Sequence, residues 1–126
     1  MKIDFVLNTD GINIVDAYSP GTIVVRKVSY HSSLILCATE IIDNWPPQTC
    51  SELTTQHLHH VISLDPEIVL LGTGSKILFP DDEILRPITE NHIGYEVMDT
   101  GAACRSYNFL VAEGRRAVAA LFMIGQ

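Results

Sequence analysis

The chain is poor in positive charge. Its 126 residues include eight lysines and arginines against fifteen aspartates and glutamates, so the formal net charge is -7 and the isoelectric point is near 5.0. Binding to nucleic acid or to anionic lipid depends on concentrated positive charge. The basic residues are scattered, apart from the pairs Arg26-Lys27 and Arg115-Arg116. We therefore expect no nucleic-acid partner.

Cysteine and long apolar runs are also scarce. The three cysteines, Cys37, Cys50 and Cys104, are too few and too widely spaced for a disulfide framework or a zinc ribbon, and they suit a reducing compartment. No apolar run approaches the roughly 20 residues that span a bilayer. The first residues lack the features of a signal or transit peptide. We expect a cytoplasmic protein without direct membrane insertion.

The composition that remains is that of a globular protein. Hydrophobic residues make up 47% of the chain and charged residues 18%, a balance typical of folded domains. The length suits one hydrophobic core, and the sequence contains no repeat, low-complexity tract or linker. We expect a single domain over residues 1–126.

The first half of the chain has the pattern of short strands. Residues 12–18 lead to the turn residues Ser19-Pro20-Gly21, and the β-branched run 22–25 follows. Apolar segments at 28–30 and 33–38 come after short connections. Short connections favour antiparallel pairing. The pattern predicts an N-terminal β-meander of three or four strands.

The second half alternates strands and helices. A helix at 51–64, with Ser51 as a possible N-cap, precedes predicted strands at 67–71, 95–98 and 117–124 and predicted helices at 82–92 and 100–113. Pro87 has to lie in the first turn of its helix or bend it. A βαβαβ order implies parallel pairing of its first two strands. The fold class is therefore expected to be α/β, with three layers and a mixed central sheet.

Two glycine-containing loops follow the first two strands of this unit. Ligands of open α/β sheets usually lie at the carboxyl ends of parallel strands. Gly72-Thr73-Gly74-Ser75-Lys76 and Asp99-Thr100-Gly101 should therefore lie side by side at that edge. The first loop lacks the full spacing of a dinucleotide-binding motif or of a P-loop. A tight turn with positive φ at Gly72 or Gly74 is its simpler interpretation.

The last predicted helix adds a possible binding surface. At about 100° per residue, Arg105 and Phe109 lie opposite the face that packs on the sheet. Exposed aromatic and arginine side chains are enriched at protein interfaces, although another element could instead cover Phe109. Arg105 and Lys76 could also hold a carboxylate or phosphate near the helix start, or Arg105 could pair with Asp99 or Glu96. The candidate binding residues are Gly72, Thr73, Gly74, Lys76, Asp99, Thr100, Arg105 and Phe109.

Other reactive residues have simpler structural interpretations. Cys104 lies in the first turn of the last predicted helix, beside Arg105, where the pKa of its thiol could be lowered. It lies on the inward face of that helix, so we expect a buried, inert thiol. His57, His59 and His60 lack a converging set of further ligands, so we expect no metal and no cofactor. Trp45 could be presented to a partner, but we prefer that it fills the gap between the meander and the helices.

Four blocks of residues resemble one protein family. They are PEIVLLGTG at 66–74, GYEVMDT at 94–100, ACRSYN at 103–108 and EGRR at 113–116. The blocks are similar to a family of small α/β proteins, mostly of unknown function, whose eukaryotic branch includes a mitochondrial assembly factor for respiratory complex I. The chain lacks a mitochondrial presequence, so it resembles a bacterial member, and Ser106 stands where threonine is expected.

The resemblance implies a three-layer fold and a role in binding protein partners, including hydrophobic or membrane-bound ones. It supplies no catalytic residues. Our first hypothesis is a non-catalytic interaction or assembly-factor-like protein, linked to the biogenesis of a membrane respiratory complex. The alternative is a small-anion binding protein or enzyme that uses the edge formed by 72–76 and 99–105. A redox or metal role through Cys104 or the histidines comes third.

Overall fold

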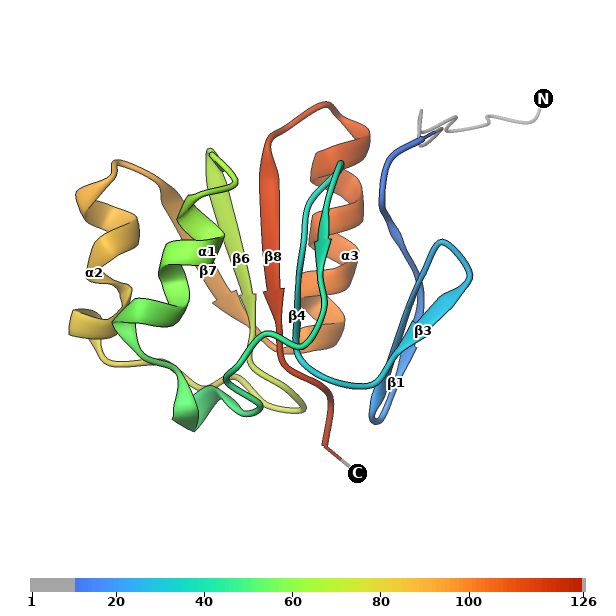
Figure 1. The fold of residues 1–126 in the computed structure, drawn as a ribbon, viewed down its shortest axis with the longest axis horizontal. Coiled ribbons are helices and arrows are strands. Elements are labelled where there is room, and N and C mark those ends of the chain that lie inside the picture. The colour runs from blue at the N-terminus through green and yellow to red at the C-terminus, as the bar shows by residue number, and fades with distance from the viewer. Residues whose placement is uncertain (1–10, 126) are drawn as a thin grey trace.

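The computed structural model describes residues 11–125 and shows a mixed α/β fold (Figure 1). A central sheet lies between helices, and a second, smaller sheet lies beside one of them. In chain order the elements are β1 (Val15–Ser19), β2 (Thr22–Val25), β3 (Val28–Tyr30), β4 (Leu34–Leu36), β5 (Ile41–Ile42), the 3-10 helices η1 (Cys50–Glu52) and η2 (Thr55–His57), α1 (Leu58–Ile62), β6 (Ile68–Gly72), α2 (Asp82–Glu90), β7 (Gly94–Met98), α3 (Thr100–Ala112) and β8 (Ala117–Leu121).

The central sheet is mixed, as predicted. Among the described residues its strand order is β5-β4-β8-β6-β7. Strand β6 pairs in parallel with β7 on one side and with β8 on the other, whereas β4 is antiparallel to β8 and to β5. The predicted parallel pairing of the first two strands of the βαβαβ unit is therefore confirmed. All carboxyl ends of β6, β7 and β8 meet at one edge of the sheet.

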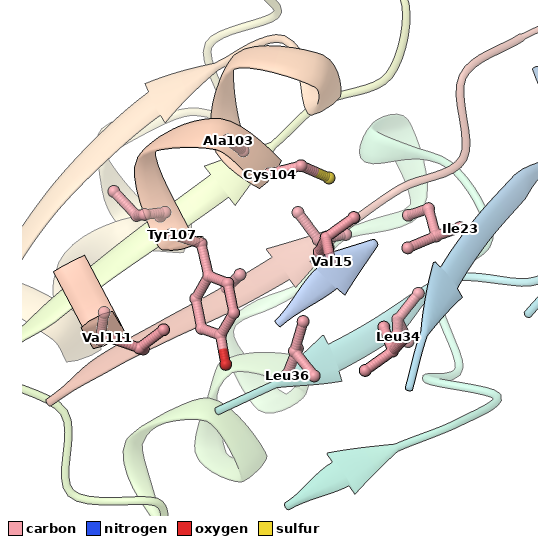
Figure 2. Close-up of a cluster of buried hydrophobic side chains, with 13 residues drawn as sticks. Val15, Ile23, Leu34, Leu36, Ala103, Cys104, Tyr107 and Val111 are labelled. Atoms are coloured by element: carbon pink, nitrogen blue, oxygen red, sulfur yellow. The ribbon is translucent and has the colours of Figure 1, made fainter. Parts of the chain in front are cut away.

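Two apolar cores lie on opposite faces of this sheet. Helix α3 and the sheet of β1, β2 and β3 cover one face, and α1 and α2 cover the other (Figure 1). Figure 2 shows the first core, where side chains of β1, β2, β4 and α3 meet. Strand β8 serves both cores, because Ala117, Ala119 and Leu121 face α3 while Val118 and Ala120 face α1 and α2. Coverage on both faces explains its continuous apolar sequence.

Over residues 11–125 the N-terminal meander has three strands, the smaller of the two numbers predicted. Strands β1, β2 and β3 form an antiparallel sheet of their own, and the fourth apolar segment, at 33–38, contributes β4 to the central sheet. Leu34 pairs there with Leu121 of β8. Leu34, Ile35 and Leu36 are all fully buried, and a strand with apolar residues on both faces is stable only when both faces are covered.

The predicted helix at 51–64 was wrong in its extent. Two 3-10 turns occupy its first half, and α1 covers Leu58–Ile62. Thr54, and not Ser51, is the N-cap residue of the second turn, and its backbone N–H donates to Nδ1 of His57 over 3.0 Å. Pro87 lies at the sixth residue of α2, so the first of its two predicted alternatives, a place in the first turn, is wrong. The strand predicted to reach residue 124 ends at Leu121.

Candidate functional site

The two predicted loops do lie side by side at the carboxyl edge of the central sheet. The backbone N–H of Thr73 donates to the carbonyl of Met98 over 2.9 Å, and the N–H of Thr100 donates to the carbonyl of Gly74 over 2.9 Å. These contacts follow directly from the parallel pairing of β6 with β7. The predicted neighbourhood of the loops is therefore confirmed.

Thr100 joins the two loops to the last strand. Its hydroxyl is fully buried, accepts a hydrogen bond from the N–H of Gly74 over 2.8 Å and donates to the carbonyl of Phe122 over 2.7 Å. A Cβ atom on Gly72 would lie 3.0 Å from the Cα of Thr100, so glycine is needed there for close approach. Gly74 has a φ of 108°, which confirms the predicted positive φ at one of the two glycines.

The backbone N–H groups at the start of α3 donate to Asp99 and Gly74. The carboxylate of Asp99 accepts from the N–H of Ala102 over 2.9 Å, and its carbonyl accepts from the N–H of Ala103. The N–H of Thr100 is bonded to Gly74. Helix starts bind anions through such free donors. Here a side-chain carboxylate already occupies the place that an anion would take.

Thr73, the threonine of the first loop, orders the segment that follows it. Thr73 is buried, and its hydroxyl donates to the carbonyl of Lys76 over 2.5 Å and accepts from the N–H of Leu78 over 3.1 Å. The Lys76 side chain is exposed and borders a hollow of about 300 Å³ together with Cys50 and Phe122. Arg105 does not line that hollow. The structure therefore does not place the two predicted cations around one common cavity.

Arg105 and Phe109 lie on the outer face of α3. Phe109 is 57% exposed, so the prediction of an exposed aromatic is confirmed, and the alternative in which another element covers it is wrong for the described part of the chain. Both residues border a hollow of about 500 Å³ with Glu96, Ile68 and Leu70. The guanidinium of Arg105 donates to the hydroxyl of Tyr18 in β1; within residues 11–125 we find no hydrogen bond from it to Asp99 or Glu96.

Sequence reasoning missed the residues that attach the smaller sheet to α3. The side-chain amide of Asn108 accepts from the N–H of Val15 and donates to its carbonyl, each over 2.8 Å. The hydroxyl of Tyr107 donates to the carbonyl of Asn13 over 2.7 Å. Together with the Arg105 contact, these bonds show that the ACRSYN block holds β1 against the helix. Within this block Ala103, Cys104 and Tyr107 are buried in the first core, whereas Arg105 and Asn108 bind residues of β1. The sequence alone did not predict these bonds.

A second feature that sequence reasoning missed is an exposed apolar loop. Ile77, Leu78 and Phe79 are 48%, 51% and 78% exposed, and they connect β6 to α2. We call these three residues the apolar tip. The signal available in the sequence was three apolar residues in succession within a loop, directly after the glycine-containing turn.

The remaining reactive residues are placed as expected. Cys104 is buried, and burial raises the pKa of its thiol to about 12. Trp45 is also buried, so its predicted burial is confirmed, and it stacks on Phe122 with ring centroids 5.2 Å apart. Its predicted place between the meander and the helices is wrong, because it lies in the second core, on the sheet face opposite β1, β2 and β3. His57 is half-buried, with its ring at 75° to that of Trp45 and the ring centroids 6.4 Å apart, and His59 and His60 are exposed.

Two absences apply to the range that the structure describes. Between residues 11 and 125 no three His, Cys, Asp or Glu side chains converge as metal ligands would. Over the same range, each helix is too short or too polar to cross a bilayer.

Known proteins are similar in sequence to most of this chain. The model of a family described as "Protein of unknown function (DUF498/DUF598)" matches residues 15–122. A Francisella tularensis protein named "13 kDa major membrane protein" is 32% identical over 99 residues, which are 78% of this chain and 80% of that protein. A Bos taurus protein named "NADH dehydrogenase (ubiquinone) 1 alpha subcomplex assembly factor 3" is 31% identical over 109 residues, 85% of this chain and 59% of that protein.

A solved structure agrees with these sequence relatives. The NMR structure of a Bordetella pertussis protein, described as an Mth938-like domain, aligns with a TM-score of 0.82 at 28% identity. The alignment covers 100% of this chain and 93% of that one.

Proposed function

The chain belongs to the DUF498/DUF598 family, and from that premise we propose that it is a non-catalytic, assembly-factor-like binding protein. In this proposal a single domain acts in the cytoplasm and supports the biogenesis of a membrane respiratory complex. One relative is named as an assembly factor and another as a membrane protein. The chain spans 59% of the bovine relative, so the activity of that longer protein enters only as part of the proposal.

The observation that carries the proposal is the exposure of Phe109 next to Arg105. Phe109 is 57% exposed on a rigid helix and borders a hollow of about 500 Å³. Aromatic and arginine side chains supply most of the binding free energy at many protein interfaces. The bond from Arg105 to Tyr18 fixes the guanidinium beside this hollow, which reduces the side-chain entropy lost on binding.

Small-anion binding at the edge of 72–76 and 99–105 is the second candidate, and it has less support. The N–H groups of Gly74, Thr100 and Ala102 are bonded within the protein. Lys76 and Arg105 border different hollows. The Cys104 thiol, with its pKa raised to about 12, is a poor nucleophile at neutral pH.

A pull-down of the full chain from cells in which it is expressed tests the first candidate. Phe109→Ala and Arg105→Glu should each remove partners that the unchanged protein retains. Val28→Ala is the matched control, because Val28 is a 52% exposed apolar residue on β3, away from the hollow. Each variant is first checked for an unchanged free energy of unfolding. Identical partners in all variants would remove this face from the proposal.

A thermal-shift screen tests the second candidate. Phosphate, nucleotides and carboxylates are added at millimolar concentration to the full chain. A ligand at about 100 times its dissociation constant should add about 2.7 kcal/mol of stability, and Lys76→Ala should abolish that gain. Stabilisation that depends on Lys76 would favour the anion site over the non-catalytic binding role.

A further inference from the structure

The apolar tip is the largest concentration of exposed apolar side chains in consecutive residues of the described chain. Ile77, Leu78 and Phe79 are each about half exposed or more. Single exposed apolar residues are ordinary, but a contiguous exposed group marks an interaction surface. Phe79, at 78% exposed, is the most accessible of the three. The tip therefore needs an explanation other than packing of the fold.

The tip is held in place by hydrogen bonds at its base. Thr73 binds both the carbonyl of Lys76 and the N–H of Leu78 through its buried hydroxyl. The hydroxyl of Ser75 accepts from the N–H of Gly125 over 2.9 Å. The bonds of Thr73 hold the backbone at Lys76 and Leu78, so the first part of the tip has a defined conformation. A preorganised surface loses less conformational entropy on binding.

Acidic residues outnumber the one exposed cation, Lys76, next to the tip in the chain. Asp81, Asp82 and Glu83 follow it in the chain and, with Glu90, line a hollow of about 670 Å³ at the start of α2. Arg86 also lines this hollow, and its guanidinium is paired with Glu83 over 3.2 Å. The hollow therefore has an excess of negative charge. Complementary charge selects the partner of a surface and speeds its association.

We propose that the apolar tip and this acidic hollow form a docking surface for a basic amphipathic segment of a partner protein. Apolar side chains of the segment pack on Phe79 and Leu78, and its lysines and arginines lie over Asp81 and Asp82. An anionic membrane is a poorer occupant, because the acidic border repels it. A second copy of this chain is also a poorer occupant, since its net charge is -7. The surface is separate from the Arg105/Phe109 face, and the inference goes beyond the function proposed above.

A labelled synthetic peptide tests this surface on the full chain. The probe is a peptide of about 18 residues, long enough to form a helix, with leucine at helical spacing and lysine at all other positions. We expect Phe79→Ser to weaken binding about tenfold or more, as the loss of a central aromatic contact does. Asp81→Asn combined with Asp82→Asn should weaken binding and reduce its dependence on salt. Val28→Ser, which removes a similarly exposed apolar side chain, should bind as the unchanged protein does.

Three results would overturn the inference. The first is equal affinity of Phe79→Ser and the unchanged protein, or of the peptide and a version with the same residues in shuffled order. The second is Phe79-dependent binding to phosphatidylglycerol vesicles, which would make the occupant a membrane. The third is Phe79-dependent self-association in sedimentation experiments. None of these measurements depends on Phe109, so this inference and the proposed function fail separately.

Discussion

The side-chain amide of Asn108 forms two hydrogen bonds of 2.8 Å with the backbone N–H and carbonyl of Val15. The amide thus takes the place of a neighbouring strand for this residue of β1. Strand β1 is bonded to β2 on its other side, and no strand pairing in the described residues links the smaller sheet to the central one. Side chains of α3 therefore make part of the attachment between the two sheets. Backbone bonds from Asn13 to Ala38 and from Gly21 to Ile124, and the shared first core, make the rest.

We predict that Asn108→Ala lowers the free energy of unfolding by about 1–3 kcal/mol, because it leaves two partly buried backbone groups without partners. Chemical denaturation measures the change. Ser106→Ala on the same helix is the control and should change stability by less than about 0.5 kcal/mol. Equal stability of Asn108→Ala and the unchanged protein would show that water replaces the amide.

Thr100→Val should destabilise the carboxyl edge. The substitution keeps the shape of the side chain but leaves the N–H of Gly74 and the carbonyl of Phe122 without their buried partner. We expect a loss of about 1–3 kcal/mol in the free energy of unfolding. Thr100→Ser retains the hydroxyl and should lose clearly less. A Thr100→Val variant at least as stable as Thr100→Ser would contradict a stabilising role of the hydroxyl.

Gly72→Ala should be costly, whereas Gly94→Ala should not. The new Cβ at Gly72 would lie 3.0 Å from the backbone of Thr100 and 3.0 Å from Leu121, whereas at Gly94 the nearest atom is 3.6 Å away. Overpacking of this kind typically costs about 1–3 kcal/mol. Thermal unfolding of the two variants provides the comparison. Similar melting temperatures would contradict the close approach of β6 and α3.

Stability should fall at alkaline pH. Burial raises the pKa of the Cys104 thiol from 9.0 to about 12, and burial also raises the pKa of Tyr107. The folded state therefore keeps the Cys104 proton more firmly than the unfolded state does. The resulting stability is complete below pH 9 and is lost as pH rises towards 12. Each such group contributes a slope of at most about 1.4 kcal/mol per pH unit.

Denaturation at a series of pH values measures this slope. Cys104→Ala removes the thiol and should reduce the alkaline loss, even though the smaller side chain lowers stability at neutral pH. An unchanged slope in Cys104→Ala would mean that the thiol ionises as easily in the folded protein as in the unfolded chain.

Trp45 should report on the core beneath α1 and α2. It is the one tryptophan of the chain, is buried, and stacks on Phe122. Its fluorescence should be blue-shifted in the folded protein and protected from iodide. Phe122→Ala should shift the emission to longer wavelength and destabilise the fold by about 3–5 kcal/mol. Quenching of the folded protein as strong as that of the unfolded chain would contradict this placement.

Sequence periodicity predicted best the elements that pack in the same way along their whole length. Strand β6 is covered on both faces, so its run of apolar residues predicted it almost to the residue, and α3 packs one face on the sheet. The segment 51–64 was misassigned in its first half only, since Leu58 and Val61, three residues apart, are buried in α1. Leu53 has extended backbone dihedrals, with φ -63° and ψ 133°, and interrupts the helix.

The candidate site was predictable in position but not in chemistry. Parallel strands bring their carboxyl ends together, so the neighbourhood of the two loops followed from topology. The hydroxyl of Thr100 donates to the carbonyl of Phe122, which follows β8 and is 22 residues further along the chain. No local pattern encodes that contact. The same holds for Arg105, whose partner Tyr18 comes from β1. Long-range polar contacts of this kind appear only in three dimensions.

The side-chain attachment of β1 also has a consequence for proteolysis. Regions held by few long-range contacts open locally without global unfolding. If the bonds from Asn108, Tyr107 and Arg105 break together with the backbone bonds of Asn13 and Gly21, strands β1, β2 and β3 can separate from α3 while the central ladder stays intact. Such an opening would expose Val15, Ile23 and Val25, which lie in the first core. The smaller sheet is therefore where a protease should cut the native protein first.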